Sequence, residues 1–448
     1  MLGVCFVKRA PKSTWRSVYR QVSSVKDSQT HVDCTIVGGG IVGLATAREL
    51  SMRHPNMKFA VVEKEKDLSL HQSKNNSGVV HAGIYYAPGS LKAKLCVQGL
   101  ERSYKYFKLK NIPHKTCGKL IVATNDQEVL HLDALYERAL ANGVPGVRMV
   151  NSDQIREIEP KCVGRKAIYS PETGIVDWRS VALSYAQDFR QNGGQIYTNF
   201  SVRAFKESPE NTEYPVYIHA LPGTVIPLPI IKTKYVITCA GLQSDRVAKL
   251  TGCTPYPKII PFRGSYLKLK EDKCDMVKTN IYPVPNPNFP FLGVHFTPRI
   301  DGSVWLGPNA LLSFDREGYG QFDFKLSDAI DSLTYPGFWK LAKKYFSYGL
   351  NEMVCNLLIR RQVKHLQKFV PTLKPSDVIR GPSGIRAQAL SLNGELVDDF
   401  VIDFGKHGIG KLIMHVRNAP SPAATSSLAI ASMLADNFEE MRKPQYRV

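Results

Sequence analysis

Three glycines near the start of the chain constrain its fold more than any other feature. A short β-branched run, 34–37, leads into them, and apolar residues then recur at helical spacing over 41–50. The glycines are Gly38, Gly40 and Gly43, with the spacing G-x-G-x-x-G. In such a turn the first glycine allows the tight bend, the second lets backbone N–H groups approach a pyrophosphate, and the third lets the helix pack on the strand. The sequence therefore predicts a β-α-β unit that binds a dinucleotide at a helix N-terminus.

An acidic residue closes the next predicted strand, 58–62. Glu63 follows Gly43 by about 20 residues, where a carboxylate can accept both ribose hydroxyls of an adenosine. Its charge would repel the 2'-phosphate of NADP, which leaves NAD or FAD. We also expect the next residue, Lys64, to contribute to the cofactor site. A glycine-rich turn without a ligand is the alternative, but the strand, the helix and the acid together disfavour it.

The length and the composition indicate a large globular protein. The chain has 448 residues, of which 43% are hydrophobic, enough to bury the cores of two domains. Its nine cysteines are scattered without a C-x-x-C pair, which favours reduced thiols in an intracellular compartment and predicts no metal site. No apolar run approaches the roughly 20 residues that span a bilayer, so any membrane contact would be peripheral.

The first 30 residues differ from the rest of the chain. Six basic residues precede the first acid, Asp27, with serines between them and no continuous apolar core. This composition is typical of a mitochondrial presequence, and a disordered basic tail is the alternative. The formal net charge of the whole chain is +20, a field that could attract nucleic acid, an anionic membrane or small anionic substrates. Since the basic residues are dispersed, we expect no nucleic-acid partner.

A polar loop follows the first β-α-β unit. It can offer backbone and side-chain donors outside regular structure, from Ser73, Asn76, Ser77 and Gly78. The run 79–86 then brings one histidine close to two tyrosines. Together with the glycine loop, these residues resemble the FAD-dependent oxidoreductases of the D-amino acid oxidase and glycerol-3-phosphate dehydrogenase superfamily. The resemblance implies that FAD is the cofactor and that this loop runs beside its pyrophosphate and isoalloxazine ring.

Two later segments fit the same superfamily. A predicted strand at 236–239 ends in Ala240 and Gly241, and the resemblance implies that this turn passes under the dinucleotide. Near the C-terminus a turn leads into a predicted helix, 426–438, whose N-terminus would point at the flavin and stabilise its reduced form. The residues carried over in this turn are Ser421, Ala423, Ala424 and Thr425. Many members of the superfamily have a glycine-rich turn there, and this chain does not.

The order of the predicted elements indicates an α/β fold. We expect a Rossmann-like FAD-binding domain and a second α+β substrate domain that is built on an antiparallel sheet, with strands over 265–269, 281–284, 291–296 and 303–307. The FAD-binding domain is predicted to be discontinuous, and the chain divides into a presequence at 1–30, the FAD-binding segments 31–90, 150–252 and 376–440, and the substrate segments 91–149 and 253–375.

Four phrases narrow the resemblance: SGVVHAGIYY, PFRGSY, GPSGIRAQ and NAPSPAATSSLAIA. They are most similar to the mitochondrial FAD-dependent 2-hydroxy-acid dehydrogenases of the superfamily. Glycerol-3-phosphate dehydrogenases instead have an HGGxRY pattern, whose arginine is replaced by Tyr85 here. The resemblance implies that a secondary alcohol next to a carboxylate is oxidised, with the C2 hydrogen leaving as hydride to flavin N5 while a base accepts the hydroxyl proton.

A small dicarboxylate substrate of this kind needs cationic partners and a base. Arginine suits a carboxylate because its fork binds both oxygens, and we expect Arg386 to be the first clamp and Arg263 the second. His81 is the favoured base and His295 its rival, because the pKa of a histidine lies near the working pH. Tyr282 is a further candidate for the cavity wall. Each of these residues could instead be an ordinary sheet residue.

Two other functions stay open. A flavin-dependent amine or amino-acid oxidase of the same fold would release hydrogen peroxide, and a non-catalytic flavin- or RNA-binding protein would use only the basic surface.

The segment 325–368 is expected to be helical and mixes aromatic residues with lysines. It could rest on an anionic membrane, although a helical cap with a solvated basic face is the simpler interpretation. A membrane quinone would then be a suitable electron acceptor.

Overall fold

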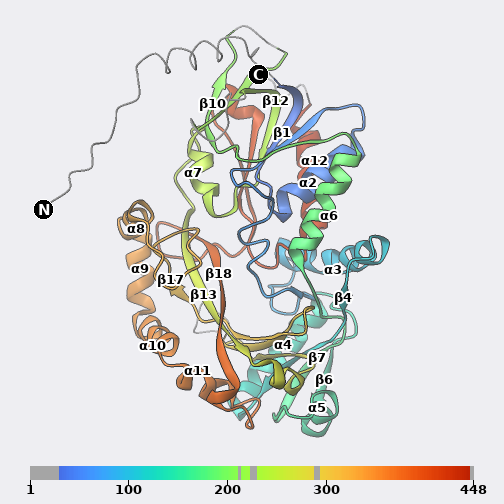
Figure 1. Ribbon diagram of the computed structural model, residues 1–448, viewed down its shortest axis with the longest axis vertical. Coiled ribbons are helices and arrows are strands. Elements are labelled where there is room, and N and C mark those ends of the chain that lie inside the picture. Colours follow the sequence, from blue (N-terminus) through green and yellow to red (C-terminus); the bar gives the residue numbers. More distant parts are fainter. Residues whose placement is uncertain (1–29, 210–212, 222–229, 287–292, 444–448) are drawn as a thin grey trace, which may run out of the picture.

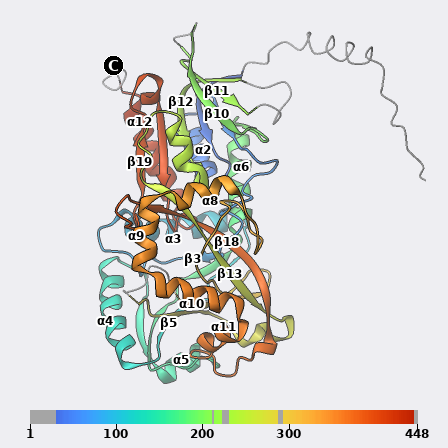
Figure 2. The ribbon, with the colours of Figure 1, turned by 90° about the vertical axis from the view of Figure 1, so that its left-hand side faces the viewer.

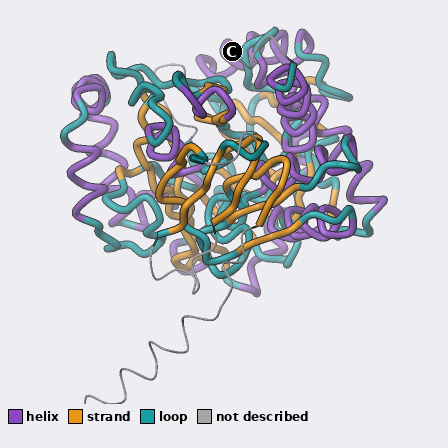
Figure 3. Tube along the Cα trace, turned by 90° about the horizontal axis from the view of Figure 1, so that it is seen from above, coloured by secondary structure: helices purple, strands orange, loops and turns teal. Residues whose placement is uncertain are grey.

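The computed structural model describes residues 30–209, 213–221, 230–286 and 293–443. The predicted presequence therefore lies outside the described residues, except for Thr30. Figure 1 shows two sheets stacked along the long axis, and Figure 3 shows the strands at the centre with helices around them. Among the described helices, none combines the length and the apolar character that a bilayer crossing requires.

The first sheet contains the glycine loop. Its order is β10 (Val202–Glu207), β11 (Val216–Ala220), β12 (Ile230–Thr238), β1 (Thr30–Val37), β2 (Phe59–Val62) and β9 (Gln195–Tyr197), with β20 (Ile413–Asn418) beside β12 and β19 (Val401–Phe404) beside β20. The strands β1, β2, β9, β12 and β20 run parallel. The central strands β1 and β12 are largely buried and rich in β-branched residues, as strands covered on both faces are.

Three helices pack side by side against this sheet. They are α2 (Ile41–Arg53), α6 (Trp178–Gln191) and α12 (Ser427–Met441), with α2 in the middle. Small residues of α2, Ala45 and Ala47, are fully buried and let the helices approach closely. Helix α3 (Leu91–Leu109) packs against α12. The carboxyl ends of the parallel strands therefore face the rest of the molecule, where ligands bind in open α/β sheets.

The second sheet is mostly antiparallel. Its order is β17 (Leu311–Leu312), β13 (Lys258–Leu269), β16 (Val304–Gly307), β15 (His295–Pro298), β14 (Asn280–Pro283), β5 (Lys119–Ala123), β7 (Lys166–Ser170) and β6 (Arg148–Asn151), and β18 (Val378–Leu390) pairs with β13. Only β14 and β5 run parallel among these pairs of described strands. A small sheet of β3 (Val79–Val80), β8 (Gly174–Val176) and β4 (His114–Lys115) adjoins.

Helices α4, α5 and α8 to α11 lie around the second sheet, whereas α7 packs mainly on β20 of the first. Figure 2 shows α8 to α11 as a continuous outer face beside β13 and β18. Their bounds, with those of the other helices and of the short 3-10 helices, are α4 (Asp126–Ala141), α5 (Ser152–Ile158), α7 (Ser244–Lys249), α8 (Leu326–Leu333), α9 (Pro336–Lys344), α10 (Phe346–Leu357), α11 (Ile359–Leu366), η2 (Gly241–Gln243), η3 (Glu271–Met276), η4 (Pro375–Asp377) and η5 (Gly408–Leu412).

The predicted α/β class, the Rossmann-like unit and the second, mostly antiparallel sheet are confirmed. Sheet membership, however, does not follow the predicted domain ranges. Strand β7 lies within 150–252 and β18 within 376–440, yet both pair in the second sheet, while α3 packs on a helix of the first. A strand's apolar pattern does not say which sheet it joins, because the pairing partner is distant in sequence. The division into two domains thus stays a prediction.

Candidate functional site

A cavity of about 740 Å³ lies where the first sheet meets the second. Its wall contains residues that follow the carboxyl ends of β1, β12 and β20, together with residues of β13, β14, β15 and β18. This volume is in the upper part of the range for ligand pockets, about 300–1,000 Å³. The cavity is therefore large enough for an extended ligand that runs from one sheet to the other.

The glycine loop forms one end of this cavity. Gly38 has a φ of +115°, and a Cβ there would lie 2.3 Å from the carbonyl oxygen of Cys239. A Cβ on Gly43 would lie 2.0 Å from the carbonyl oxygen of Gly38. Gly38 and Gly43 lie on the side of the turn that packs against the protein, while Gly40 lines the cavity. The close approach of strand and helix thus requires glycine at 38 and at 43.

The N-terminus of α2 opens into the same space. Gly40 provides no side-chain cap, the first turn has no acidic residue, and Ile41 and Val42 line the cavity. Ser73 lies alongside, where its Oγ accepts a hydrogen bond of 2.9 Å from the Ile41 N–H. The positive end of the helix dipole is therefore available to an anion, as a pyrophosphate site requires.

Glu63 and Lys64 lie beside the glycine loop but outside the cavity wall. The Glu63 carboxylate accepts hydrogen bonds from the N–H groups of Gly39, at 2.7 Å, and Glu65, at 2.9 Å. These two bonds hold the backbone of the glycine loop and of the segment after β2 in place.

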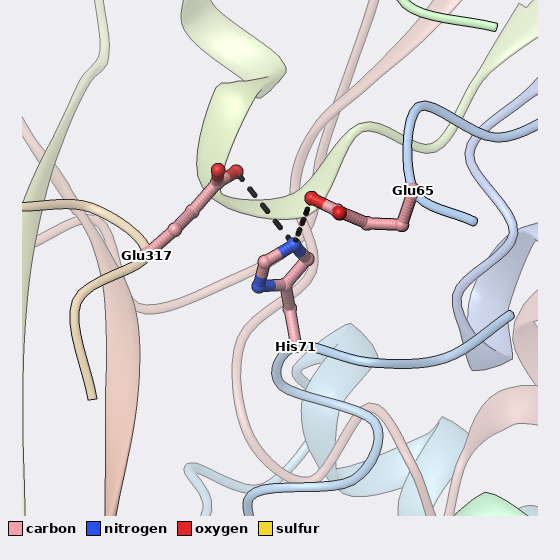
Figure 4. A group of neighbouring side chains, drawn as sticks. All are labelled: Glu65, His71 and Glu317. Carbon is pink, nitrogen blue, oxygen red and sulfur yellow. Dashed lines mark hydrogen bonds and ion pairs between the residues drawn. The ribbon is translucent and has the colours of Figure 1, made fainter. Parts of the chain in front are cut away.

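Lys64 is engaged in a cluster of charged side chains. Figure 4 shows His71 between Glu65 and Glu317, a group with the spacing of metal ligands. Lys64 Nζ contacts Glu65, Glu317 at 2.9 Å and His71 at 3.1 Å. The ammonium therefore already supplies the positive charge at the centre of this cluster.

The polar loop between β2 and β3 reaches the cavity as expected. Ser73, Asn76 and Ser77 line it. The Asn76 side chain holds the loop in shape, since its Nδ2 donates to the Gln72 and Ser73 carbonyls and its Oδ1 accepts from the Gly78 N–H. Gly78 itself lies outside the wall, and a Cβ there would lie 2.4 Å from Arg299 Nη1.

Two further turns complete the cofactor end. Gly241 lines the cavity with a φ of +51°, and Ala240 does not. The residues before α12 that line it include Ser421, Ala423, Ala424 and Thr425, with the helix N-terminus directly behind them. In the described part of the chain the buried Ser426 Oγ has no hydrogen-bond partner. The two helix N-termini that open into the cavity fit a bound group that carries acceptor oxygens and nitrogens, as a flavin dinucleotide does.

Four candidate catalytic residues converge at the other end of the cavity: His81, Tyr282, His295 and Arg386. The His295 ring stacks on the Tyr282 ring, with centroids 3.9 Å apart and 22° between planes. His295 Nδ1 lies 3.0 Å from the Gly293 carbonyl oxygen, which can only accept, so Nδ1 carries the proton. Burial lowers the pKa of His295 to about 3, so the imidazole is neutral near pH 7.

The two predicted clamps are separated. Arg386 lines the cavity, and its charge helps to lower the pKa of His295. Arg263 is outside the wall, and its Nη1 donates to the Gly320 carbonyl. In the β13–β18 register Arg386 faces Phe262, whereas Arg263 faces Ile385. Successive residues of a strand point to opposite faces, so Arg263 is turned away from the cavity.

Lys119 is a functional candidate that the sequence did not reveal. It begins β5, it is 1% exposed, and its Nζ lies 3.4 Å from His81 Nδ1 and 4.3 Å from the centre of the Tyr282 ring. Burial lowers the pKa of Lys119 to about 7. A lysine at the start of an apolar strand is usually solvated, and its burial here depends on β14, which is distant in sequence.

Comparisons with known proteins agree with this geometry. The family model described as FAD dependent oxidoreductase matches residues 33–437. A Nematostella vectensis protein named L-2-hydroxyglutarate dehydrogenase, mitochondrial, is 58% identical over 92% of this chain and 91% of its own length. The Homo sapiens protein of that name is 55% identical over 92% of this chain and 90% of its own.

Solved structures give the same fold. Dithionite-reduced L-alpha-glycerophosphate oxidase from Mycoplasma pneumoniae, with FAD bound, has a TM-score of 0.72 and 25% identity, and the match covers 92% of this chain and 95% of the oxidase. Glycine oxidase from Geobacillus kaustophilus has a TM-score of 0.65 and 17% identity, over 93% of this chain and 96% of its own. The second likeness concerns the fold alone.

Proposed function

The chain belongs to the FAD dependent oxidoreductase family, and we propose that it oxidises L-2-hydroxyglutarate to 2-oxoglutarate. The relatives that are more than half identical over nine tenths of the chain carry the name of that dehydrogenase. One structural observation carries the proposal. Arg386 and two histidines line the same cavity as the glycine loop, so a carboxylate clamp and a base face the cofactor site.

The cofactor is FAD, which accepts the C2 hydride of the substrate at N5 when it is bound. The N-terminus of α2 with Ser73 would bind the pyrophosphate, and Glu63 would hold the ribose end through the loop that it fixes. Ser77 and the turn 421–425 would contact the ring region, with the positive end of α12 behind them.

Arg386 would bind the carboxylate next to the alcohol, because its guanidinium fork matches two oxygens. Arg263 faces away, so the second carboxylate needs another cation. Lys92, in the first turn of α3, and Arg138, in α4, also line the cavity and are the candidates for this role. The hydroxyl proton would pass to a neutral histidine, either His81 or His295.

A panel of possible substrates tests this function. The FAD-loaded protein should reduce an artificial dye with L-2-hydroxyglutarate, but not with the D-enantiomer, amino acids or glycerol 3-phosphate. Formation of hydrogen peroxide with an amino acid would instead support the amine oxidase alternative, and no reaction with any member of the panel would support a binding protein.

The outer face of α8 to α11 supports a proposal about the location. Its exposed apolar side chains lie on consecutive helices and include Leu326, Ile330, Trp339, Phe346, Leu350 and Met353. Lys340, Lys343 and Lys344 are exposed among them. Apolar and cationic side chains on one face suit an anionic membrane surface. We therefore propose that the protein, whose relatives are named mitochondrial, rests on a membrane by this face and passes electrons to a membrane quinone.

A further inference from the structure

We infer that Lys119 holds His81 as a hydrogen-bond donor toward the cavity and thereby leaves His295 as the base. The inference rests on the proposed oxidation of a hydroxy acid and assigns the two histidines different roles. Lys119 acts through His81 and is a positioning residue.

The position of Lys119 is unusual for a cation. Its Nζ is enclosed between the rings of Tyr282, at 4.3 Å, and Tyr85, at 5.2 Å, and its side chain is 1% exposed. Within the part of the chain that the structure describes, no carboxylate lies within 4.0 Å of Nζ. A buried ammonium without a counter-ion is costly, so its retention beside His81, which lines the cavity, indicates a role beyond stability.

The groups around Lys119 leave His81 as its only hydrogen-bond acceptor among the described residues. Titratable groups face Lys119 from five segments. They are Cys96 of α3, Cys117 of the segment before β5, His81 and Tyr85 of the loop after β3, Tyr282 of β14 and His295 of β15. Burial raises the pKa of Cys96 to about 12 and also raises that of Cys117, so neither thiol carries a charge near pH 7.

The contact with Lys119 decides which nitrogen of His81 carries the proton. Below its pKa of about 7, Lys119 is an ammonium group with three donors and no lone pair, so His81 Nδ1, 3.4 Å away, must accept. The proton of the neutral imidazole is then on Nε2, the nitrogen left for the cavity. The backbone N–H of His81 donates to Thr425 Oγ1 at 3.1 Å, which fixes the residue beside the N-terminal turn of α12.

His295 is held in the opposite tautomer. Its Nδ1–H donates to the Gly293 carbonyl, so Nε2 keeps its lone pair, and the stacked Tyr282 ring fixes the ring plane. Of the two histidines, His295 is therefore the one whose nitrogen can accept a proton without a prior rearrangement.

The two histidines also respond differently to the substrate. Burial lowers the pKa of His295, and so do the charges of Arg386 and Lys119; a substrate carboxylate on Arg386 would offset the first of these charges and make His295 more basic. The basicity of His81 would not rise in the same way, because the substrate cannot offset the charge of Lys119, which is sealed from the cavity and has no counter-ion. Its imidazolium would stay disfavoured.

The step balances as follows. With FAD bound, the C2–H bond would break and its electron pair would leave as hydride to the flavin, the O–H proton would go to His295 Nε2, and the C2–O bond would become the carbonyl of 2-oxoglutarate. His81 would donate its Nε2–H to an oxygen of the bound substrate or cofactor and take up no proton.

Glutamine variants of the two histidines test the roles. Glutamine can place an N–H close to the Nε2 position but is no base. The rate constant of anaerobic flavin reduction should fall at least about a hundredfold in H295Q, as expected when a base is lost, and about tenfold or less in H81Q. A larger loss in H81Q than in H295Q, with FAD bound in both, would overturn the assignment.

Lys119 variants give a second readout. Because burial lowers the pKa of Lys119 to about 7, the wild-type kcat/KM should fall as the pH rises above that value. K119R, whose charge persists, should keep its activity at alkaline pH, whereas K119M should lose at least about tenfold at neutral pH. A wild-type profile that rises through this range, with K119R inactive but loaded with FAD, would instead make Lys119 the final proton acceptor and refute the inference.

A third readout needs no turnover. Nitrogen NMR of the FAD-loaded protein with labelled histidines, with the His81 signals assigned from H81Q, should show His81 protonated on Nε2 and His295 on Nδ1. The reverse tautomers would overturn the inference even if the substrate were another compound. If the tautomers are as stated but L-2-hydroxyglutarate leaves the flavin oxidised, the proposed substrate fails and the positioning by Lys119 stands.

Discussion

Arg386 and Arg263 lie on opposite faces of the β13–β18 pair, one register position apart. Arg386 is opposite Phe262, and Arg263 is opposite Ile385. Arg386 therefore shares the cavity with Tyr266, whereas Arg263 is bound to the Gly320 carbonyl behind the sheet. This register separates the proposed substrate clamp from a structural arginine that carries the same charge.

The first prediction concerns these two arginines. R386Q removes a charged fork from the cavity, and kcat/KM should fall about tenfold to a hundredfold, since a hydrogen bond to a charged group contributes about 1.5–3 kcal/mol. The matched control is R263K, which keeps a cationic donor for Gly320, and its kcat/KM should change by no more than about twofold. Steady-state kinetics of both variants provide the check, and an R263K defect as large as that of R386Q would contradict the assignment of faces.

The second prediction compares two helical glycines. G43A should lose FAD, because the new Cβ would lie 2.0 Å from the Gly38 carbonyl and would push α2 away from the turn. G349A, in α10, has no atom within 4 Å of the new Cβ and should keep its FAD. It should also gain up to about 1 kcal/mol from the better helix propensity of alanine. The ratio of flavin absorption to protein absorption measures the difference, and a full flavin content in G43A would argue against the cradle.

The third prediction concerns stability and pH. The folded pKa of Lys119, about 7, lies below its unfolded value, so the unfolded chain binds the proton more readily between those values. Stability from this group is therefore present at alkaline pH and is lost as the pH falls toward 7. K119M removes the cost of the buried charge, and its Tm should exceed that of the wild type by a few degrees at pH 7, with a smaller gain near pH 10. A lower Tm for K119M at pH 7 would show that the ammonium stabilises the fold.

The fourth prediction concerns the outer face of α8 to α11. W339S combined with F346S removes two exposed aromatic side chains, and co-sedimentation with vesicles of phosphatidylcholine and phosphatidylglycerol should decrease. L130S, which removes an exposed leucine from α4, is the matched control and should bind like the wild type. Wild-type protein that ignores the anionic vesicles would contradict the peripheral membrane contact.

Local patterns predicted much of this structure. The strand, glycine turn and helix at 34–53 follow from short-range spacing, and the cap of α4 is also local, because the Asn125 side chain accepts from the Glu128 N–H at 2.9 Å. Such features depend on neighbours in the sequence, and they can therefore be predicted before the fold is known.

Features that depend on distant partners were harder to predict. Asp245 lies in the first turn of α7, but its carboxylate does not cap that helix and instead binds Arg316, 71 residues away. The direction of Arg263 depends on the register with β18, and the burial of Lys119 depends on β14. Neither residue carries a local signal of its surroundings, because a one-residue shift in register reverses the face of every side chain.

Anaerobic titration of the FAD-loaded protein with L-2-hydroxyglutarate tests the central claim most directly. The visible flavin band should bleach, and one 2-oxoglutarate should form for each flavin reduced, with no bleaching by the D-enantiomer. A flavin that stays oxidised, or that is reduced equally by an amino acid or by glycerol 3-phosphate, would contradict the account.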